Sequence, residues 1–296
     1  MRRARIGTGA ALLTATGFAD EEAFGHPRDF LKNQFVYLVI SPRARGLSVG
    51  VNVNPVARCN LNCVYCEVDR KQPARAPEFD VDRMADELRS TLLVAKSGWL
   101  RQQPYYSNLP ADLLEIRHVA LSGDGEPTLS DHFVEAVQGL ISVRAAGDFF
   151  KIVLITNSTA LDQVQAQEGL ELLISEDEVW AKLDGGTQAY LNKVNGPNVT
   201  LERVLGNILA VARKRPVVIQ SLFPAVNGKE PSAADISEYA QRLKELRVAG
   251  AKIPLVQIYS ATRPMARAGC THLPLKSLKH IAQTVRKISG LRAEVF

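Results

Sequence analysis

Residues 47–66 read LSVGVNVNPVARCNLNCVYC, an apolar run typical of a buried strand that is followed directly by three cysteines. Cys59, Cys63 and Cys66 are separated by three and then two residues. In a loop, this spacing can turn three thiolates toward one centre, and cysteine thiolates hold iron–sulfur clusters. A [4Fe–4S] cluster has four irons, so three cysteines leave one iron open to another ligand.

A structural zinc site is the alternative reading, with the three cysteines completed by Cys270 or His272. Structural zinc sites usually contain two Cys-x-x-Cys halves, whereas this sequence has one. The cysteines could also be unrelated core residues, and Cys270 is most simply an inert buried thiol. Three clustered cysteines out of four indicate a reduced, metal-binding intracellular protein rather than a disulfide framework.

Strand-like and helix-like segments alternate beyond the cysteines. The strand-like runs are 51–53, 118–122, 152–156, 179–183, 217–222 and 255–259, and helical patterns occupy 81–95, 131–145, 161–173, 201–213, 233–249 and 275–288. This alternation predicts a parallel sheet with helical crossovers. The periodicity leaves open whether the sheet is open and doubly wound or curled into a whole or partial barrel. In either architecture a ligand binds at the carboxyl ends of the strands.

The N-terminal part of the chain has a different character. Two β-rich runs, 35–40 and 47–54, are joined by a basic connection with Pro and Gly, which predicts a hairpin. A helix is expected over 20–33. The first residues are expected to form a frayed cytoplasmic tail, with an export signal as the alternative. Residues 97–112, which contain Trp99, Tyr105 and Tyr106, are interpreted as an insertion that is either a hydrophobic cover or a substrate lid.

The composition is that of an ordinary globular protein. The 296 residues are 46% hydrophobic and 23% charged, which excludes a disordered chain, a collagen-like repeat and a coiled coil. No apolar run approaches the roughly 20 residues of a membrane-spanning helix. The net charge of +5 is spread along the chain. It is compatible with an anionic partner and equally with a plain globular surface.

A glycine-rich turn follows the second core strand, where residues 122–129 read SGDGEPTL. Glycines at the end of a strand let the backbone approach a ligand closely, and Glu126 could accept a hydrogen bond from an ammonium group. Taken alone, the stretch is also consistent with a turn that caps a helix.

Polar side chains end the later strands as well. They are Asn157, Lys182, Asp184, Gln220 and Tyr259. Each one taken singly is most simply a cap or a loop anchor, and Lys182 with Asp184 could be an ion pair at the sheet edge. Their appearance on successive strands favours one ligand that lies across the strand ends, because such a ligand needs contacts from several strands.

These features together resemble the radical S-adenosylmethionine (SAM) superfamily. The cysteine spacing, the aromatic Tyr65 before the last cysteine, and a turn similar to the superfamily's Gly-Gly-Glu-Pro motif carry the resemblance. It implies an α/β fold with a partial (β/α)6 TIM-like barrel and an N-terminal hairpin extension. The implied division is a tail and extension over 1–46, a core over 47–264 and a C-terminal helical segment over 265–296.

The resemblance also implies the chemistry. Cys59, Cys63 and Cys66 would hold a [4Fe–4S] cluster whose open iron binds the amino and carboxylate groups of SAM. Reductive cleavage, with electrons from a flavodoxin- or ferredoxin-type donor, would yield a 5′-deoxyadenosyl radical that abstracts hydrogen from a substrate. The implied SAM-contacting residues are Tyr65, Gly123, Asp124, Gly125, Glu126, Pro127, Asn157, Lys182, Asp184, Gln220 and Tyr259.

Within the superfamily, the sequence is most similar to the iron–sulfur oxidoreductase group that includes the tRNA wybutosine-synthesis enzyme. The matching stretches are 50–54, 59–66, 123–129, 182–184, 190–197 and 256–264. That enzyme carries a second cluster and a lysine that engages pyruvate. Here no cysteine precedes Cys59 and only Cys270 follows Cys66, so a second cluster and the wybutosine reaction are not expected.

The substrate is expected to be a modest-sized or anionic molecule, with no membrane partner. Basic residues near the cluster loop and after the last strand could receive it, or could equally form a solvated surface, with Arg263 paired to an acidic neighbour: Arg43, Arg45, Arg70, Lys71, Arg75 and Arg263. RNA is a further candidate, although the chain contains no RNA-binding module. Three other functions stay open: a glycyl-radical activase of a partner protein, a tRNA base-modifying enzyme, and a non-catalytic iron–sulfur or zinc module.

Overall fold

A single curled sheet organises the chain in the computed structural model, which describes residues 30–68, 70, 76, 78–196, 199–261 and 269–296. The sheet has eight strands in the order β1-β2-β3-β4-β5-β6-β8-β10. Neighbouring strands are parallel, except that β1 runs antiparallel to β2. The helix expected over 20–33 lies almost wholly outside the described residues, which begin with a short 3-10 turn, η1 (Phe30–Lys32).

The strands lie close to their predicted positions. Their bounds are β1 Val36–Ser41, β2 Gly46–Val51, β3 Ile116–Leu121, β4 Ile152–Thr156, β5 Glu178–Lys182, β6 Val217–Leu222, β8 Val256–Tyr259 and β10 Ala293–Val295. The predicted hairpin is confirmed as β1 and β2. Three short strands were not predicted: β10, and a separate antiparallel pair formed by β7 (Pro224–Val226) and β9 (Cys270–His272).

The six predicted helices are present as α1 Val81–Lys96, α3 Phe133–Ala146, α4 Val164–Glu171, α6 Leu201–Lys214, α7 Ala233–Val248 and α8 Leu275–Ser289. Several begin at a side-chain cap, such as the Ser232 hydroxyl, which accepts a hydrogen bond from the Asp235 N–H. The helix α5 (Gln188–Asn195) was not predicted. The insertion forms three short pieces, η2 Trp99–Gln102, α2 Pro104–Ser107 and η3 Ala111–Leu114.

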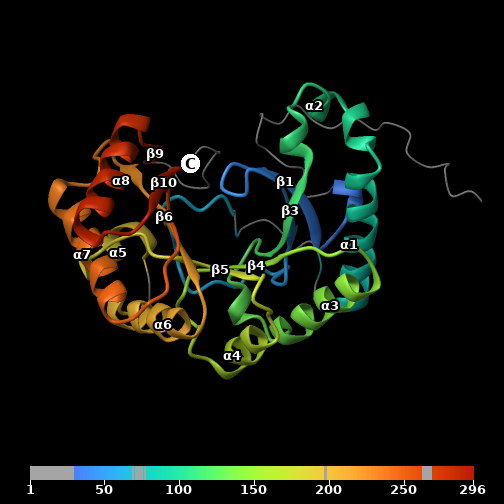
Figure 1. Ribbon diagram of the computed structural model, residues 1–296, viewed down its shortest axis with the longest axis horizontal. Helices are drawn as coiled ribbons and strands as arrows, with labels where there is room; N and C mark the ends of the chain where they lie inside the picture. The colour runs from blue at the N-terminus through green and yellow to red at the C-terminus, as the bar shows by residue number, and fades with distance from the viewer. Residues whose placement is uncertain (1–29, 69, 71–75, 77, 197–198, 262–268) are drawn as a thin grey trace, which may run out of the picture.

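The sheet curls so that one face looks outward and the other inward. Figure 1 shows the helices α1, α3, α4, α6, α7 and α8 arranged along the outside of the curled strands. The predicted partial barrel is therefore confirmed over the described residues. No helix in this part of the chain is both long enough and apolar enough to cross a bilayer.

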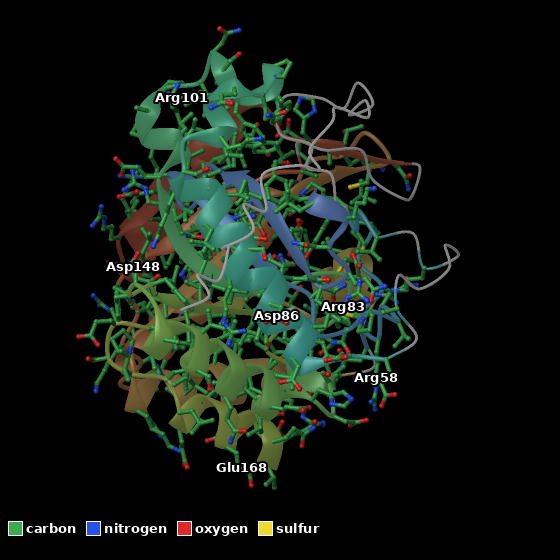
Figure 2. The ribbon with its side chains drawn as sticks, turned by 90° about the vertical axis from the view of Figure 1, so that its right-hand side faces the viewer. Arg58, Arg83, Asp86, Arg101, Asp148 and Glu168 are labelled. Atoms are coloured by element: carbon green, nitrogen blue, oxygen red, sulfur yellow. The ribbon has the colours of Figure 1, made fainter. Side chains whose placement is uncertain are left out.

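Charged side chains are spread over the outer surface. Figure 2 shows Arg58, Arg83 and Arg101 on the same side of the molecule as Asp86, Asp148 and Glu168. Several of these charges are paired, as Arg89 is with Asp86 at 2.7 Å. The labelled charges on this side are therefore of mixed sign rather than a single basic patch.

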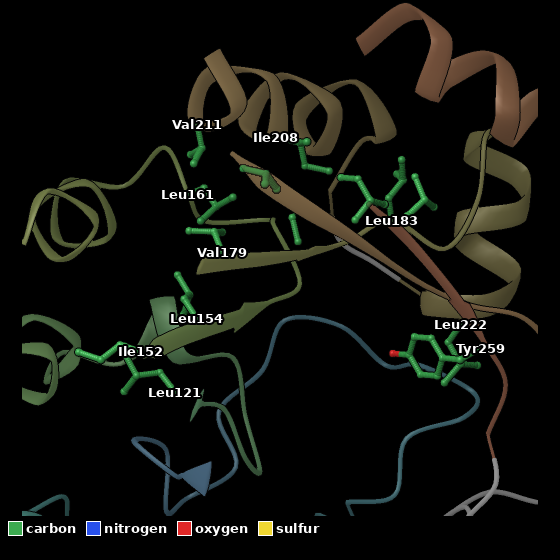
Figure 3. Packing of buried hydrophobic residues seen from close by; sticks show 14 of the residues in the cluster. Leu121, Ile152, Leu154, Leu161, Val179, Leu183, Ile208, Val211, Leu222 and Tyr259 are labelled. Atoms are coloured by element: carbon green, nitrogen blue, oxygen red, sulfur yellow. The ribbon is translucent and has the colours of Figure 1, made fainter. Parts of the chain in front are cut away.

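The outward face of the strands is apolar and carries the main hydrophobic core. Leu121, Leu154, Val179 and Ile219 are fully buried there, and Figure 3 shows side chains of this cluster from the sheet meeting those of α6. Because side chains alternate across a strand, the residues between them point to the inner face.

The inner face is mixed in character. Ala120, Val153, Trp180 and Val218 form a small apolar cluster of their own. Polar side chains of the same strands lie on this face as well. Near the start of the strands, the Ser48 hydroxyl lies 2.8 Å from Nε2 of His118.

The turn of the β1–β2 hairpin joins the two ends of the sheet. Ala44 packs against the inner apolar cluster, and Arg45 forms a 2.8 Å ion pair with Glu294 of β10. The predicted domain boundary after residue 46 falls inside this hairpin, and β10 brings the C-terminal segment into the same sheet. The division into three parts stays a prediction.

Candidate functional site

The cysteine loop begins where β2 ends, at the carboxyl end of the parallel strands. Its backbone is fixed from two sides. The N–H groups of Asn62 and Val64 donate to the carbonyls of Asn195 and Val194 in α5, at 2.8 and 2.9 Å. On the other side, the Glu126 N–H donates to the Arg58 carbonyl at 2.9 Å. The loop is therefore held between α5 and the glycine-rich turn.

The two glycines of that turn lie where a side chain would collide with a neighbouring residue. Gly123 has a φ of +136°, and a Cβ atom on it would lie 2.7 Å from Oδ1 of Asn52. A Cβ on Gly125 would lie 2.3 Å from the Arg58 carbonyl oxygen. The glycines were predicted to admit a ligand. In the structure Gly125 makes room for the backbone at Arg58, next to Cys59, and Gly123 makes room for the side chain of Asn52. Asp124 between them accepts a 2.8 Å hydrogen bond from Asn52.

Glu126 lies in this turn with 2% of its surface exposed. Its Oε1 accepts from the Thr128 N–H and hydroxyl and from the Thr156 hydroxyl, at 3.2, 2.7 and 2.6 Å, and its Oε2 accepts from the Asn157 N–H at 2.6 Å. Burial raises the pKa of Glu126, against the lowering effect of these hydrogen bonds. The carboxylate thus joins the ends of β3 and β4, and Pro127 opens the short η4 turn (Pro127–Leu129).

Two amide side chains donate to the cysteine sulfurs. Asn157 Nδ2 lies 3.7 Å from Sγ of Cys59, and Asn195 Nδ2 lies 3.3 Å from Sγ of Cys63. Burial raises the pKa of Cys59 and raises that of Cys63 to about 11. Both thiols are therefore protonated at neutral pH unless a metal ion or cluster takes the place of the proton.

The three sulfurs are not gathered around one point. Among the described residues, no three His, Cys, Asp or Glu side chains are placed to hold a metal ion. The thiols of Cys59 and Cys66 interact electrostatically, while that of Cys63 faces Asn195 and Asp184. The zinc alternative required Cys270 or His272 to complete the site. Cys270 is buried on β9 and His272 is exposed on that strand, and neither belongs to a group of metal-ligating side chains in the described residues.

The chemistry of the donor set nevertheless fits a three-thiolate cluster. Three soft sulfur donors belong to one loop, and two of them accept N–H hydrogen bonds of the kind that adjust cluster potentials. In addition, Oδ1 of Asn195 is buried without a hydrogen-bond partner beside Cys63. This amide oxygen could accept a hydrogen bond from a group bound beside Cys63.

A second network lies next to the cysteine loop and is centred on Asp184, which is 2% exposed. Asp184 accepts from the Tyr65 hydroxyl, from Asn195 Nδ2 at 2.8 Å and from the Leu222 N–H at 2.9 Å. Lys182 forms the predicted ion pair with it at 3.6 Å. The carboxylate therefore connects the end of β5 to the aromatic residue of the cysteine loop.

Lys182 also donates to the Tyr259 hydroxyl at 3.0 Å, which connects β5 to β8. Burial favours the neutral amine, but the charge of Asp184 and the Tyr259 hydroxyl outweigh it and raise the pKa of Lys182. Burial, and then the charge of Asp184, raise the pKa of Tyr65. At neutral pH Lys182 is therefore an ammonium ion and Tyr65 a neutral phenol.

The structure divides the predicted residues into groups. Glu126 and Asn157 adjoin Cys59, whereas Tyr65, Lys182, Asp184 and Tyr259 share the second network. Gln220 is the cross-strand partner of Lys182, and its side chain donates to Gln257 at 2.9 Å on the inner face. Asn195 touches Cys63, Tyr65 and Asp184 and was not predicted as a site residue, although the resembling stretch 190–197 contains it.

The basic residues that the sequence singled out differ in their surroundings. Arg70 donates to the Leu61 carbonyl at 2.8 Å and so braces the cysteine loop. Arg45 pairs with Glu294, and Arg43 lies on the ring of Tyr259. Lys71, Arg75 and Arg263 lie outside the described residues, so their predicted roles are not tested.

Comparison with known proteins gives sequence relatives of low identity. No family model matches the chain. A UPF0026 protein of Synechocystis sp. is 26% identical over 177 residues, which cover 58% of this chain and 57% of the relative. A UPF0026 protein of Helicobacter pylori is 25% identical over 218 residues, covering 72% of this chain and 63% of the relative. The chain therefore spans about three fifths of the length of these curated relatives.

Solved structures give the fold. SuiB of Streptococcus suis bound to S-adenosylmethionine has a TM-score of 0.56 at 14% identity, covering 86% of this chain and 52% of SuiB. TYW1 with a bound lysine-pyruvate adduct has a TM-score of 0.54 at 17% identity, covering 83% of this chain and 74% of TYW1. Both are radical SAM enzymes. The resemblance predicted from the sequence is therefore confirmed for the fold.

Proposed function

We propose that this protein is a radical SAM enzyme that binds one [4Fe–4S] cluster and one molecule of SAM. The observation that carries the proposal is the position of the Cys-x3-Cys-x2-Cys loop. It follows the first parallel strand of a fold shared with radical SAM enzymes, and it packs directly against the glycine-rich turn of the next strand.

Cys59, Cys63 and Cys66 would hold the cluster, and residues 123–127 would bind the methionine end of SAM. When bound, these groups supply the reductive cleavage of SAM to a 5′-deoxyadenosyl radical that abstracts hydrogen from the substrate. Tyr65, Asn157, Lys182, Asp184, Gln220 and Tyr259 are the remaining proposed contacts at the strand ends. Binding of a cofactor across several strand ends is the usual arrangement in barrels of parallel strands.

The chain's own residues would prepare the site in three ways. Asn157 and Asn195 donate N–H groups to the sulfurs of Cys59 and Cys63, which stabilises negative charge on sulfur. Glu126 fixes the turn and the end of β4 in one arrangement through its four accepted hydrogen bonds. The buried Asp184 network fixes Tyr65 beside the loop and restricts water there.

The proposed partners are a modest-sized or anionic substrate and an external electron donor of the flavodoxin or ferredoxin type. The reaction of this chain is proposed to take place in the cytoplasm, where thiols remain reduced. An activase that acts on a partner protein would share the same cluster and the same first step. It would differ by requiring the partner for hydrogen abstraction.

The test is anaerobic reconstitution with iron and sulfide, reduction with dithionite, addition of SAM and measurement of 5′-deoxyadenosine. We expect the wild-type protein to form 5′-deoxyadenosine and Cys59→Ala to form none, with reduced iron binding. Cys270→Ala is the matched control and should retain both, because Cys270 lies on β9, outside the loop. A cluster that neither binds nor cleaves SAM would contradict the proposal, and stoichiometric zinc in place of iron would indicate a structural site.

A further inference from the structure

One cationic side chain on the inner side of the half-barrel lacks a counter-charge. Arg43, in the turn of the β1–β2 hairpin, stacks its guanidinium 4.2 Å from the centre of the Tyr259 ring. Its Nε is buried and has no hydrogen-bond partner. Within the described part of the chain, no carboxylate forms an ion pair with it. A buried donor of this kind is costly unless a ligand satisfies it.

A second cation contacts the same aromatic ring. Lys182 Nζ lies 5.4 Å from the centre of the Tyr259 ring and 3.0 Å from its hydroxyl. The turn at the beginning of β2 and the end of β5 therefore bring a guanidinium and an ammonium to one tyrosine. Figure 3 shows that the Tyr259 hydroxyl points away from β8 toward the middle of the curled sheet.

The local charge is positive even when Asp184 is included. Asp184 offsets Lys182, and its oxygens already accept from Tyr65, Asn195 and the Leu222 N–H. This carboxylate therefore has little capacity left for Arg43. Arg45, two residues further along the turn, shows the contrast, because its guanidinium is paired with Glu294 at 2.8 Å.

We propose that Arg43 and Lys182 bind an oxyanion, a carboxylate or a phosphate group, of the substrate on the inner face of the half-barrel. Arginine suits this role because its planar donors match two oxygens at once, while lysine acts as a point charge. The inference deepens the proposed function, since the molecule held there is the one that the radical would attack. Anion binding itself needs neither the cluster nor SAM.

The test measures anion binding to the purified protein by calorimetry, with inorganic phosphate and malonate as separate probes. We expect at least one probe to bind, and Arg43→Gln to weaken it about tenfold, the loss expected for one charged hydrogen bond. Arg43→Lys should recover part of the affinity. Arg45→Gln is the matched control and should stay within about twofold of wild type. The stronger probe identifies the kind of oxyanion.

Three results would overturn the assignment. The wild-type protein could bind neither probe, or Arg43→Gln and Arg45→Gln could weaken binding equally, which would indicate general surface charge. Alternatively, Arg43→Gln could weaken SAM binding to the reconstituted protein as much as it weakens anion binding. The site would then belong to the carboxylate of the cofactor. The wild-type protein could also bind anions through Arg43 and yet form no 5′-deoxyadenosine. That result would contradict the proposed function but not the anion site.

Discussion

The two faces of the curled sheet are built from the same strands and have opposite properties. On the outer face, Leu121, Leu154 and Ile219 are fully buried among apolar neighbours beneath the helices. On the inner face, strands of the same sheet carry His118, Lys182 and Gln220, which are hydrogen-bonded to polar partners. One face therefore supplies most of the apolar burial, and the other provides the polar and charged groups of the candidate site.

The difference shows how a strand can be buried on both sides and still provide polar and charged side chains to a binding site. A polar group that leaves water must find a hydrogen-bond partner, and His118, Lys182 and Gln220 on the inner face find theirs on other strands of the sheet. Gln220 and Gln257, at 1% and 2% exposure, satisfy each other in this way across β6 and β8. Substitutions on the outer face should therefore act mainly on stability, and those at the strand ends mainly on ligand binding.

The largest effect should come from the outer face. Leu154→Ala should lower the free energy of unfolding by about 2–5 kcal/mol, because it leaves a cavity in a fully buried cluster. Denaturant unfolding measures this. Leu93→Ala, at a position 71% exposed on α1, is the matched control and should change little. A loss below about 1 kcal/mol for Leu154→Ala would mean that the outer face does not carry the core.

The inner face should make stability depend on pH through His118. Burial lowers the pKa of His118 from 6.5 to about 4, so the folded protein keeps it neutral where the unfolded chain protonates it. The free energy of unfolding should fall by about 1.4 kcal/mol per pH unit below 6.5, by about 3 kcal/mol in all, and level off near pH 4.

Unfolding of His118→Gln between pH 7 and pH 5 measures this contribution. The variant should lose less stability over that interval than the wild-type protein, by about 2 kcal/mol. His280→Gln, on the exposed side of α8, serves as the control and should follow the wild-type curve. Equal slopes for His118→Gln and wild type would show that the inner face is open to water at His118.

The contact between the glycine turn and the cysteine loop should respond to one added methyl group. Gly125→Ala should cost about 1–3 kcal/mol through overpacking against the Arg58 carbonyl. It should also reduce iron binding after reconstitution, because the loop must shift. Gly206→Ala in α6 adds the same methyl group where no atom lies within 4 Å. It should keep full iron binding and gain up to about 1 kcal/mol. Equal iron binding in both variants would show that the glycine turn does not determine the position of the cysteine loop.

The smallest effect is expected at the contact between the two ends of the sheet. Arg45 and Glu294 are 69% and 24% exposed, so their ion pair should contribute below about 1 kcal/mol. Thermal unfolding of Arg45→Gln at low and high salt measures it, and the difference from wild type should shrink as salt is added. A larger, salt-independent loss would mean that the turn is part of the core.

The sequence predicted the parts of the fold that depend on local patterns. The bounds of β4 and β6 agree with the prediction because both strands begin with a continuous apolar run, 152–155 in β4 and 217–219 in β6. The helix α5 was missed because it has eight residues, of which Gln188, Asn192, Lys193 and Asn195 are polar and weaken the helical pattern. The three residues of β10 gave too short a signal.

The candidate site was predictable as a set of residues and not as a set of contacts. The spacing of the cysteines and the polar strand ends are visible in the sequence. Two of the residues that donate to Glu126, Thr156 and Asn157, lie 30 and 31 residues away at the end of β4 and depend on how the strands align. Likewise, Arg43 reaches Tyr259 only because the sheet curls until its first and last strands approach each other. Long-range geometry of this kind leaves no local signal.

The pairing of Arg45 with Glu294 also bears on the order of folding. The two residues are 249 positions apart, so their contact closes one of the longest loops in the described chain. The entropy lost on closing a loop rises with its length, and contacts of high sequence separation form slowly. The β1–β2 hairpin should therefore form early from neighbouring residues and then wait for β10. The contact between Arg43 and Tyr259 of β8 also joins distant parts of the chain. The inner face should therefore be the last part of the barrel to become complete.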